Sequence, residues 1–179
     1  GGHDGSACLI KDGQVVAFAT ERITRKKKDR GIRERQIKYL LEKARADWDD
    51  IDYVAVCNWF SDRNENGELW KKSGIMLRNA NGTGYTMEQF VEFYNSGQQV
   101  QNVVLEIDLY GHAIPCFIVD HHFAHCCASY YTSPFKSAVA LSVDFADGFS
   151  RNHMVCLFNS DDSYHIVKTG SDFDIGSVY

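Results

Sequence analysis

A short histidine-rich segment between two apolar runs is the feature that most constrains the fold of this chain. Residues 116–119 and residues 138–143 are apolar runs of strand length, and residues 121–131 lie between them. We interpret residues 121–131 as a helix, so the chain is predicted to run strand, helix, strand in this region.

The predicted helix brings two histidines together. In a helix over residues 121–131, His121 and His125 stand one turn apart on the same face. Their imidazole nitrogens could then share one cation at about 2.0–2.1 Å each. His122 points about 100° further round the helix, so at most one of the two adjacent histidines aligns well with His125. The alternative is two unrelated histidines on a helix surface, one of them hydrogen-bonded in the core.

Composition places the chain among ordinary globular domains. Its 179 residues, 44% hydrophobic and 24% charged, are enough for one domain or one lobe of a larger fold. The net charge of −5 argues against a general nucleic-acid binder. No apolar run approaches the length of a membrane span, and no signal peptide precedes the first motif. The six cysteines include no Cys-x-x-Cys pair, so neither a zinc ribbon nor a disulfide framework is expected and a cytoplasmic location is favoured.

The N-terminal part reads as a hairpin, a helix and a strand. Apolar runs at residues 7–10 and 14–20 flank Asp12-Gly13, a pair preferred where both turn residues need positive φ. Residues 33–46 carry apolar side chains with helical periodicity, and residues 52–57 form a β-branched strand. A helix between strands in this way suggests a crossover onto a sheet.

The segment between the hairpin and that helix is basic. Residues 21–35 are rich in lysine and arginine and include Gly31. The simple interpretation is a solvated loop and first helical turn. The functional alternative places one or two of these cations against a phosphate or a carboxylate.

Residues 61–102 change character, because Asn, Gly, Ser and Gln dominate there. We interpret this segment as an insertion or lid that contains one short helix near residues 87–94. The chain opens in a loop and closes on what looks like the start of an element, so a fragment of a larger protein is expected. The remaining strands are predicted at residues 103–109, 116–119, 138–144, 153–158 and 164–169.

Four sequence motifs resemble those of one enzyme family, in the family's order. They are His3–Gly13, Glu21–Lys27, His121–His125 with Ala128–Phe135, and Val143–Gly148. Together they resemble the N-terminal part of the O-carbamoyltransferases that modify antibiotics, toxins and nodulation factors. Residues 61–102 lie outside the resemblance.

The resemblance implies both a fold and a reaction. The fold would be α/β: an actin/Hsp70-like ATPase (ribonuclease H-like) lobe with a mixed sheet and flanking helices, akin to the tRNA threonylcarbamoyl transferase domain. ATP and carbamoyl phosphate would form carbamoyl-adenylate in a C-terminal domain absent from residues 1–179. The carbamoyl group would then pass to a hydroxyl of a small-molecule acceptor. The expected partners are this acceptor and the rest of the same protein, with a homodimer possible and no nucleic acid or membrane.

The resemblance also implies roles for seven residues. Two histidines match the metal ligands, for which iron or zinc is favoured, and the third ligand is expected from outside the chain. A neutral imidazole at His3 could accept the proton of the attacking hydroxyl, and Lys27 could stabilise negative charge. Without the resemblance, His3 is more simply a loop residue and Lys27 a solvated one. The full assignments are His121 and His125 to the metal, His3 and Lys27 to catalysis, and Asp144, Asp147 and Gly148 to the nucleotide or carbamoyl-adenylate.

Two other functions remain open at this point. A threonylcarbamoyl transferase acting on tRNA is disfavoured by the acidic balance and by Phe123-Ala124, where a Glu-Gly pair is expected. A catalytically idle nucleotide-binding or interaction module with the same fold is the other alternative.

Overall fold

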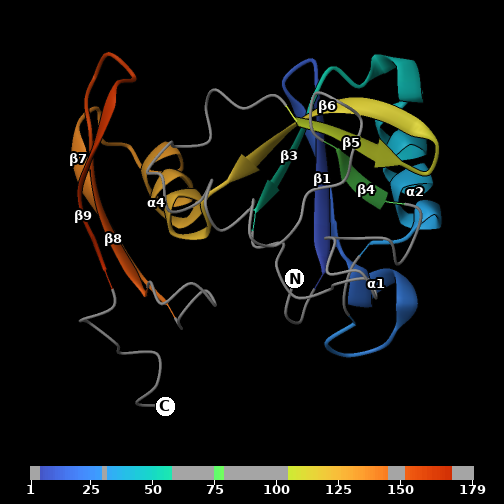
Figure 1. The fold of residues 1–179 in the computed structure, drawn as a ribbon, viewed down its shortest axis with the longest axis horizontal. Coiled ribbons are helices and arrows are strands. Elements are labelled where there is room, and N and C mark those ends of the chain that lie inside the picture. The colour runs from blue at the N-terminus through green and yellow to red at the C-terminus, as the bar shows by residue number, and fades with distance from the viewer. Residues whose placement is uncertain (1–4, 30–31, 58–74, 79–104, 145–151, 171–179) are drawn as a thin grey trace. The chain divides into compact units, whose positions relative to one another are not determined.

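The computed structural model describes residues 5–29, 32–57, 75–78, 105–144 and 152–170. The chain divides into two compact units, residues 1–118 and residues 119–179, and each is described by itself (Figure 1). Among the described residues, no helix is both long and apolar enough to cross a membrane.

The first unit begins with the predicted β-hairpin. Strands β1 (Ser6–Lys11) and β2 (Gln14–Ala19) pair antiparallel, with Lys11 opposite Gln14. Both connecting residues have positive φ, 51° at Asp12 and 74° at Gly13, as a two-residue hairpin turn of the favoured hand requires. The hairpin prediction is confirmed.

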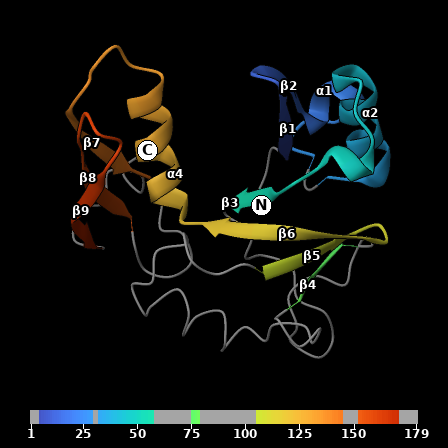
Figure 2. The same cartoon turned by 90° about the horizontal axis from the view of Figure 1, so that it is seen from above.

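Two helices follow the hairpin. The short helix α1 (Thr20–Thr24) lies in the segment interpreted as a loop. Helix α2 (Glu34–Ala44) confirms the helix predicted for residues 33–46, and it packs against the hairpin (Figure 2). Its Leu40 and Leu41 side chains are buried. It ends at Arg45, which has a left-handed backbone with φ of 53°.

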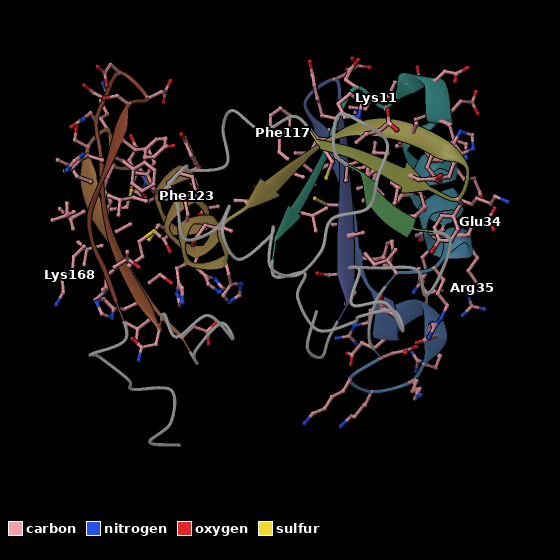
Figure 3. The ribbon with its side chains drawn as sticks, viewed as in Figure 1. Lys11, Glu34, Arg35, Phe117, Phe123 and Lys168 are labelled. Carbon is pink, nitrogen blue, oxygen red and sulfur yellow. The ribbon has the colours of Figure 1, made fainter. Side chains whose placement is uncertain are left out.

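A short helical turn, η1 (Trp48–Asp50), is tied back to the hairpin by Lys11 (Figure 3). The ammonium group of Lys11 donates to Oδ2 of Asp50 at 2.9 Å and to the carbonyl of Arg45 at 3.3 Å. This ion pair raises the pKa of Lys11 and joins the end of β1 to the connection that follows α2.

A four-stranded sheet completes the described part of the first unit. Its order is β3 (Val54–Cys57), β6 (His112–Val119), β5 (Leu105–Leu109), β4 (Ile75–Arg78). Strands β5 and β6 form a hairpin through Tyr110 and Gly111, both at positive φ. The buried side chains include Ile107, Leu109, Ile114 and Cys116.

Two features of this sheet differ from the sequence predictions. Strand β6 starts at His112, earlier than predicted, because Pro115 is accommodated in the strand opposite Glu106. Strand β4 falls within residues 61–102, where no strand was predicted, and it pairs with β5. The short helix expected near residues 87–94 lies outside the described residues.

The second unit packs one helix on one face of a sheet. Helix α4 (His121–Tyr131) covers the antiparallel strands β7 (Ala138–Val143), β8 (His153–Phe158) and β9 (Tyr164–Gly170), in that order. Phe123 extends from α4 toward the sheet, whereas Lys168 projects from the opposite face (Figure 3).

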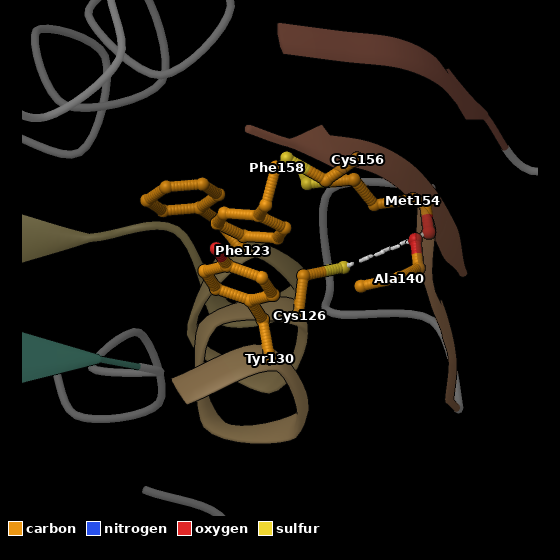
Figure 4. Close-up of a cluster of buried hydrophobic side chains, with 7 residues drawn as sticks. All are labelled: Phe123, Cys126, Tyr130, Ala140, Met154, Cys156 and Phe158. Atoms are coloured by element: carbon orange, nitrogen blue, oxygen red, sulfur yellow. Dashed lines mark hydrogen bonds between the residues drawn. The ribbon is translucent and has the colours of Figure 1, made fainter. Parts of the chain in front are cut away.

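The core of this unit is aromatic and sulfur-rich (Figure 4). The rings of Tyr130 and Phe158 stack with centroids 4.4 Å apart, and Cys126 lies within reach of strand β7. These contacts explain why residues 121–131 form a helix, since every third or fourth residue is buried. The α/β class with sheets and flanking helices is confirmed, as are the elements predicted at 121–131, 138–144, 153–158 and 164–169.

Candidate metal centre

The first turn of α4 is fixed by an N-terminal cap. Oδ1 of Asp120 accepts a hydrogen bond from the backbone N–H of Phe123 at 2.9 Å. Asp120 is itself buried, and its carbonyl accepts the first helical bond from Ala124. An aspartate at this position both satisfies a free N–H and favours helix initiation. The helix therefore begins at His121, which fixes the direction of the next turn.

Three potential ligand atoms converge beside this turn. Nε2 of His121 lies 2.9 Å from Oδ2 of Asp144, and Nε2 of His125 lies 3.2 Å from the same oxygen. The two Nε2 atoms are 3.2 Å apart. In the described part of the chain, this is the one group of three His, Cys, Asp or Glu residues whose ligand atoms approach one another closely enough to hold a metal ion.

The spacing fits a single small divalent ion. Two ligands that each lie about 2.0–2.1 Å from a tetrahedral ion are separated by roughly 3.3–3.4 Å. The observed separations of 2.9–3.2 Å need to open only slightly to reach that geometry. Two imidazole nitrogens and one carboxylate oxygen are also a donor set that zinc and non-haem iron accept, with positions left for water or substrate.

Asp144 belongs to this group, although the sequence motifs assigned it to the nucleotide or carbamoyl-adenylate. It directly follows β7, and its backbone N–H donates to the carbonyl of Asn152 at 3.0 Å. The motif match placed it on the nucleotide loop, and the third metal ligand was expected from outside the chain. The alternation of residues along the strand could have indicated its position, because it puts Asp144 on the same face as Ala140 and Ser142. The structure shows these two residues buried beneath α4.

The structure describes one further predicted site residue, Lys27. Lys27 is exposed in the turn between α1 and α2, in the first unit. His3, Asp147 and Gly148 lie outside the described residues. The structure therefore brings together His121, His125 and Asp144 from the predicted set.

An ion pair between the buried Asp29 and the half-exposed Arg33 anchors the segment that carries Lys27. Asp29 is 6% exposed, and its two carboxylate oxygens accept from both terminal nitrogens of Arg33, at 3.0 and 3.1 Å. The carbonyl of Asp29 accepts from the N–H of Gly5 at 3.0 Å. Lys27 lies two residues before Asp29, and His3 lies two residues before Gly5. The backbone bond thus joins the two segments that carry the predicted catalytic pair.

The Asp29 pair makes stability depend on pH in acid. Hydrogen bonds from Arg33, then Thr24, lower the pKa of Asp29 from 3.8 to about 2. Because the folded state prefers the ionised form, its contribution is complete above about pH 5 and is lost as pH falls from about 4 toward 2. Asp29→Asn should therefore lower the unfolding temperature of the full-length protein at pH 7. The unfolding temperature of this variant should also decline less than the parent's between pH 5 and 2. The exposed Asp52→Asn is the control, and an Asp29→Asn variant with the parent's pH profile would contradict the assignment.

The cysteines of α4 are not candidate nucleophiles. Burial raises the pKa of the Cys126 thiol to about 12 and that of the Cys127 thiol to about 11. Both thiols are therefore protonated at neutral pH, and a nucleophilic sulfur requires the thiolate. The histidines are therefore the candidate functional side chains of this helix.

Comparison with known proteins identifies a family. A family model described as "Carbamoyltransferase N-terminus" matches residues 2–179. The chain is 27% identical to an uncharacterized protein of Methanocaldococcus jannaschii over 99% of its own length and 27% of the relative's. It is 27% identical to the nodulation protein NolNO of Sinorhizobium fredii over 83% of its own length and 20% of the relative's.

A third relative extends the same pattern. An uncharacterized protein of a Synechocystis species is 26% identical over 79% of the chain and 24% of the relative. The chain thus spans about a quarter of the length of these curated relatives. No solved structure matches the chain.

Proposed function

The chain belongs to the family of carbamoyltransferase N-terminal regions, and on that premise we propose that it forms part of an ATP- and metal-dependent O-carbamoyltransferase. Carbamoyl phosphate and ATP are the proposed co-substrates, carbamoyl-adenylate is the intermediate, and a hydroxyl of a small molecule is the acceptor. The actin/Hsp70-like ATPase fold belongs to this proposal. So does the remainder of the protein as the place where the adenylate forms.

The observation that carries the metal dependence is the convergence of three ligand atoms on one point. His121, His125 and Asp144 would hold the ion, with iron or zinc favoured by the imidazole ligands. A bound divalent ion would act there as a Lewis acid toward a phosphoryl or carbonyl oxygen. The family match supports a transferase, and this donor set supports a metal-dependent one.

The remaining predicted residues take the roles that the transfer step requires. The acceptor oxygen attacks the carbamoyl carbon, the bond from that carbon to the adenylate oxygen breaks, and AMP leaves. His3 accepts the proton of the attacking hydroxyl. Lys27, exposed and cationic, stabilises the negative charge of the adenylate phosphate, and Asp147 and Gly148 contact the nucleotide.

The proposal also covers the cellular location of the protein and its partners. A reducing cytosol suits this chain, because the cysteines with described side chains are free thiols. Neither a nucleic acid nor a membrane is proposed as a partner, and a homodimer is compatible with the reaction.

The test is ATP consumption by the full-length protein with and without carbamoyl phosphate. We expect consumption to require carbamoyl phosphate and to yield a carbamoylated product when a hydroxyl acceptor is supplied. ATP binding without such consumption would favour the idle nucleotide-binding module. Transfer of a threonylcarbamoyl group to tRNA would favour the other alternative.

A further inference from the structure

One histidine of α4 lies next to the candidate metal centre without belonging to it. The side chain of His122 is completely buried, and its Nδ1 lies 3.1 Å from Oγ of Ser142 on β7. Ser142 is only 5% exposed. Burying two polar side chains costs desolvation free energy unless they hydrogen-bond to each other. The pair therefore favours one placement of α4 on β7.

The pair lies between two other polar contacts that α4 makes, one with Ala140 on β7 and one with Asp144 directly after β7. Alternate residues of the strand, followed by Asp144, face the helix. At one end Sγ of Cys126 lies 3.8 Å from the carbonyl of Ala140, a weak contact that tolerates small shifts (Figure 4). At the other end Asp144 meets the two candidate ligands of the helix.

From this arrangement we propose that the His122–Ser142 hydrogen bond positions Asp144 for metal binding. His122 follows His121 directly in the helix, and Ser142 lies two residues before Asp144 on the same face of the strand. The bond therefore joins α4 to β7 close to the candidate ligands. It lies one residue from His121 in the helix and two residues from Asp144 along the strand. His122 and Ser142 are positioning residues, and the inference rests on the metal centre of the proposed function.

Loss of this bond should weaken metal binding, because metal sites tolerate only small displacements of their ligand atoms. Ligand positions must hold within about 0.2 Å of ideal distances for tight binding. Apolar packing alone fixes the helix on the strand less directionally than a buried hydrogen bond does. Loss of an interaction that orients ligands typically lowers metal affinity by about 10–100-fold.

The experiment measures zinc affinity of the full-length protein by competition with a chromophoric chelator, and the visible spectrum after cobalt substitution. Ser142→Ala removes the hydroxyl and should weaken zinc binding by at least about 10-fold. His122→Asn keeps a polar atom near the position of Nδ1 and should retain affinity close to the parent's. Tyr130→Phe is the matched control, because it removes a partly buried hydroxyl that donates to the carbonyl of Lys136 at 2.9 Å, at the other end of α4.

The outcomes separate positioning from general stability. We expect Tyr130→Phe to lower the unfolding temperature without changing the zinc affinity or the cobalt spectrum. Parental affinity in Ser142→Ala, or an equal loss of affinity in Tyr130→Phe, overturns the proposal. If Ser142→Ala does not fold, equal zinc affinities in His122→Asn and His122→Leu overturn it.

Failure of this inference is distinct from failure of the proposed function. If the parent protein binds zinc and Ser142→Ala binds it equally well, the inference alone is wrong. If the parent protein binds neither zinc nor cobalt, the metal centre is wrong and the inference falls with it.

Discussion

Replacing His121 and His125 together with alanine should abolish metal retention and carbamoyl transfer in the full-length protein. The double variant removes two of the three ligand atoms that converge in the structure. Asp144 alone cannot hold a divalent ion tightly, since affinity depends on the number of ligands and their support. Carbamoyl-adenylate formation should continue, because the proposal places it in the remainder of the protein.

The matched control for this double variant is His165→Ala. His165 is exposed on β9, and its loss should leave the metal content unchanged. Metal content is measured by elemental analysis after dialysis, alongside the unfolding temperature of each variant. Parental metal content in the folded double variant contradicts the site.

The helix that carries these histidines was predictable because its signals are local. Asp120 is a capping residue directly before the helix, and Phe123, Cys126 and Tyr130 recur at helical spacing. The hairpin at Asp12-Gly13 was predictable for the same reason, since positive φ at both residues is a local requirement.

The contact of Asp144 with the histidines was not predicted, because it is tertiary. Twenty-three positions separate His121 from Asp144, and only the packing of α4 on β7 brings them together. Helical geometry similarly showed that at most one of His121 and His122 aligns well with His125. It did not show that Ser142 would be the partner.

Strand β4 escaped prediction for a different reason. The four residues Ile75–Arg78, three of them apolar, are too few to show alternation, and the strand forms by pairing with the distant β5. The start of β6 was missed because the predicted strand began after Pro115, although β6 includes that residue.

The candidate metal centre depends most on Asp144. Its carboxylate oxygen lies within 3.2 Å of both imidazole nitrogens, and an amide at this position would lose the negative charge that favours a cation. Asp144→Asn should therefore lower zinc affinity by about 10–100-fold or more. Asp162→Asn is the control, because Asp162 is an exposed acid in the turn between β8 and β9.

The decisive measurement is a pair of titrations on the full-length parent and Asp144→Asn proteins. Zinc affinity is measured by chelator competition, and binding of a non-hydrolysable adenylate analogue is measured with the metal removed by a chelator. We expect weakened zinc binding in Asp144→Asn and unchanged binding of the analogue. Parental zinc affinity together with weakened binding of the analogue would contradict it, and would place Asp144 on the nucleotide instead of the metal.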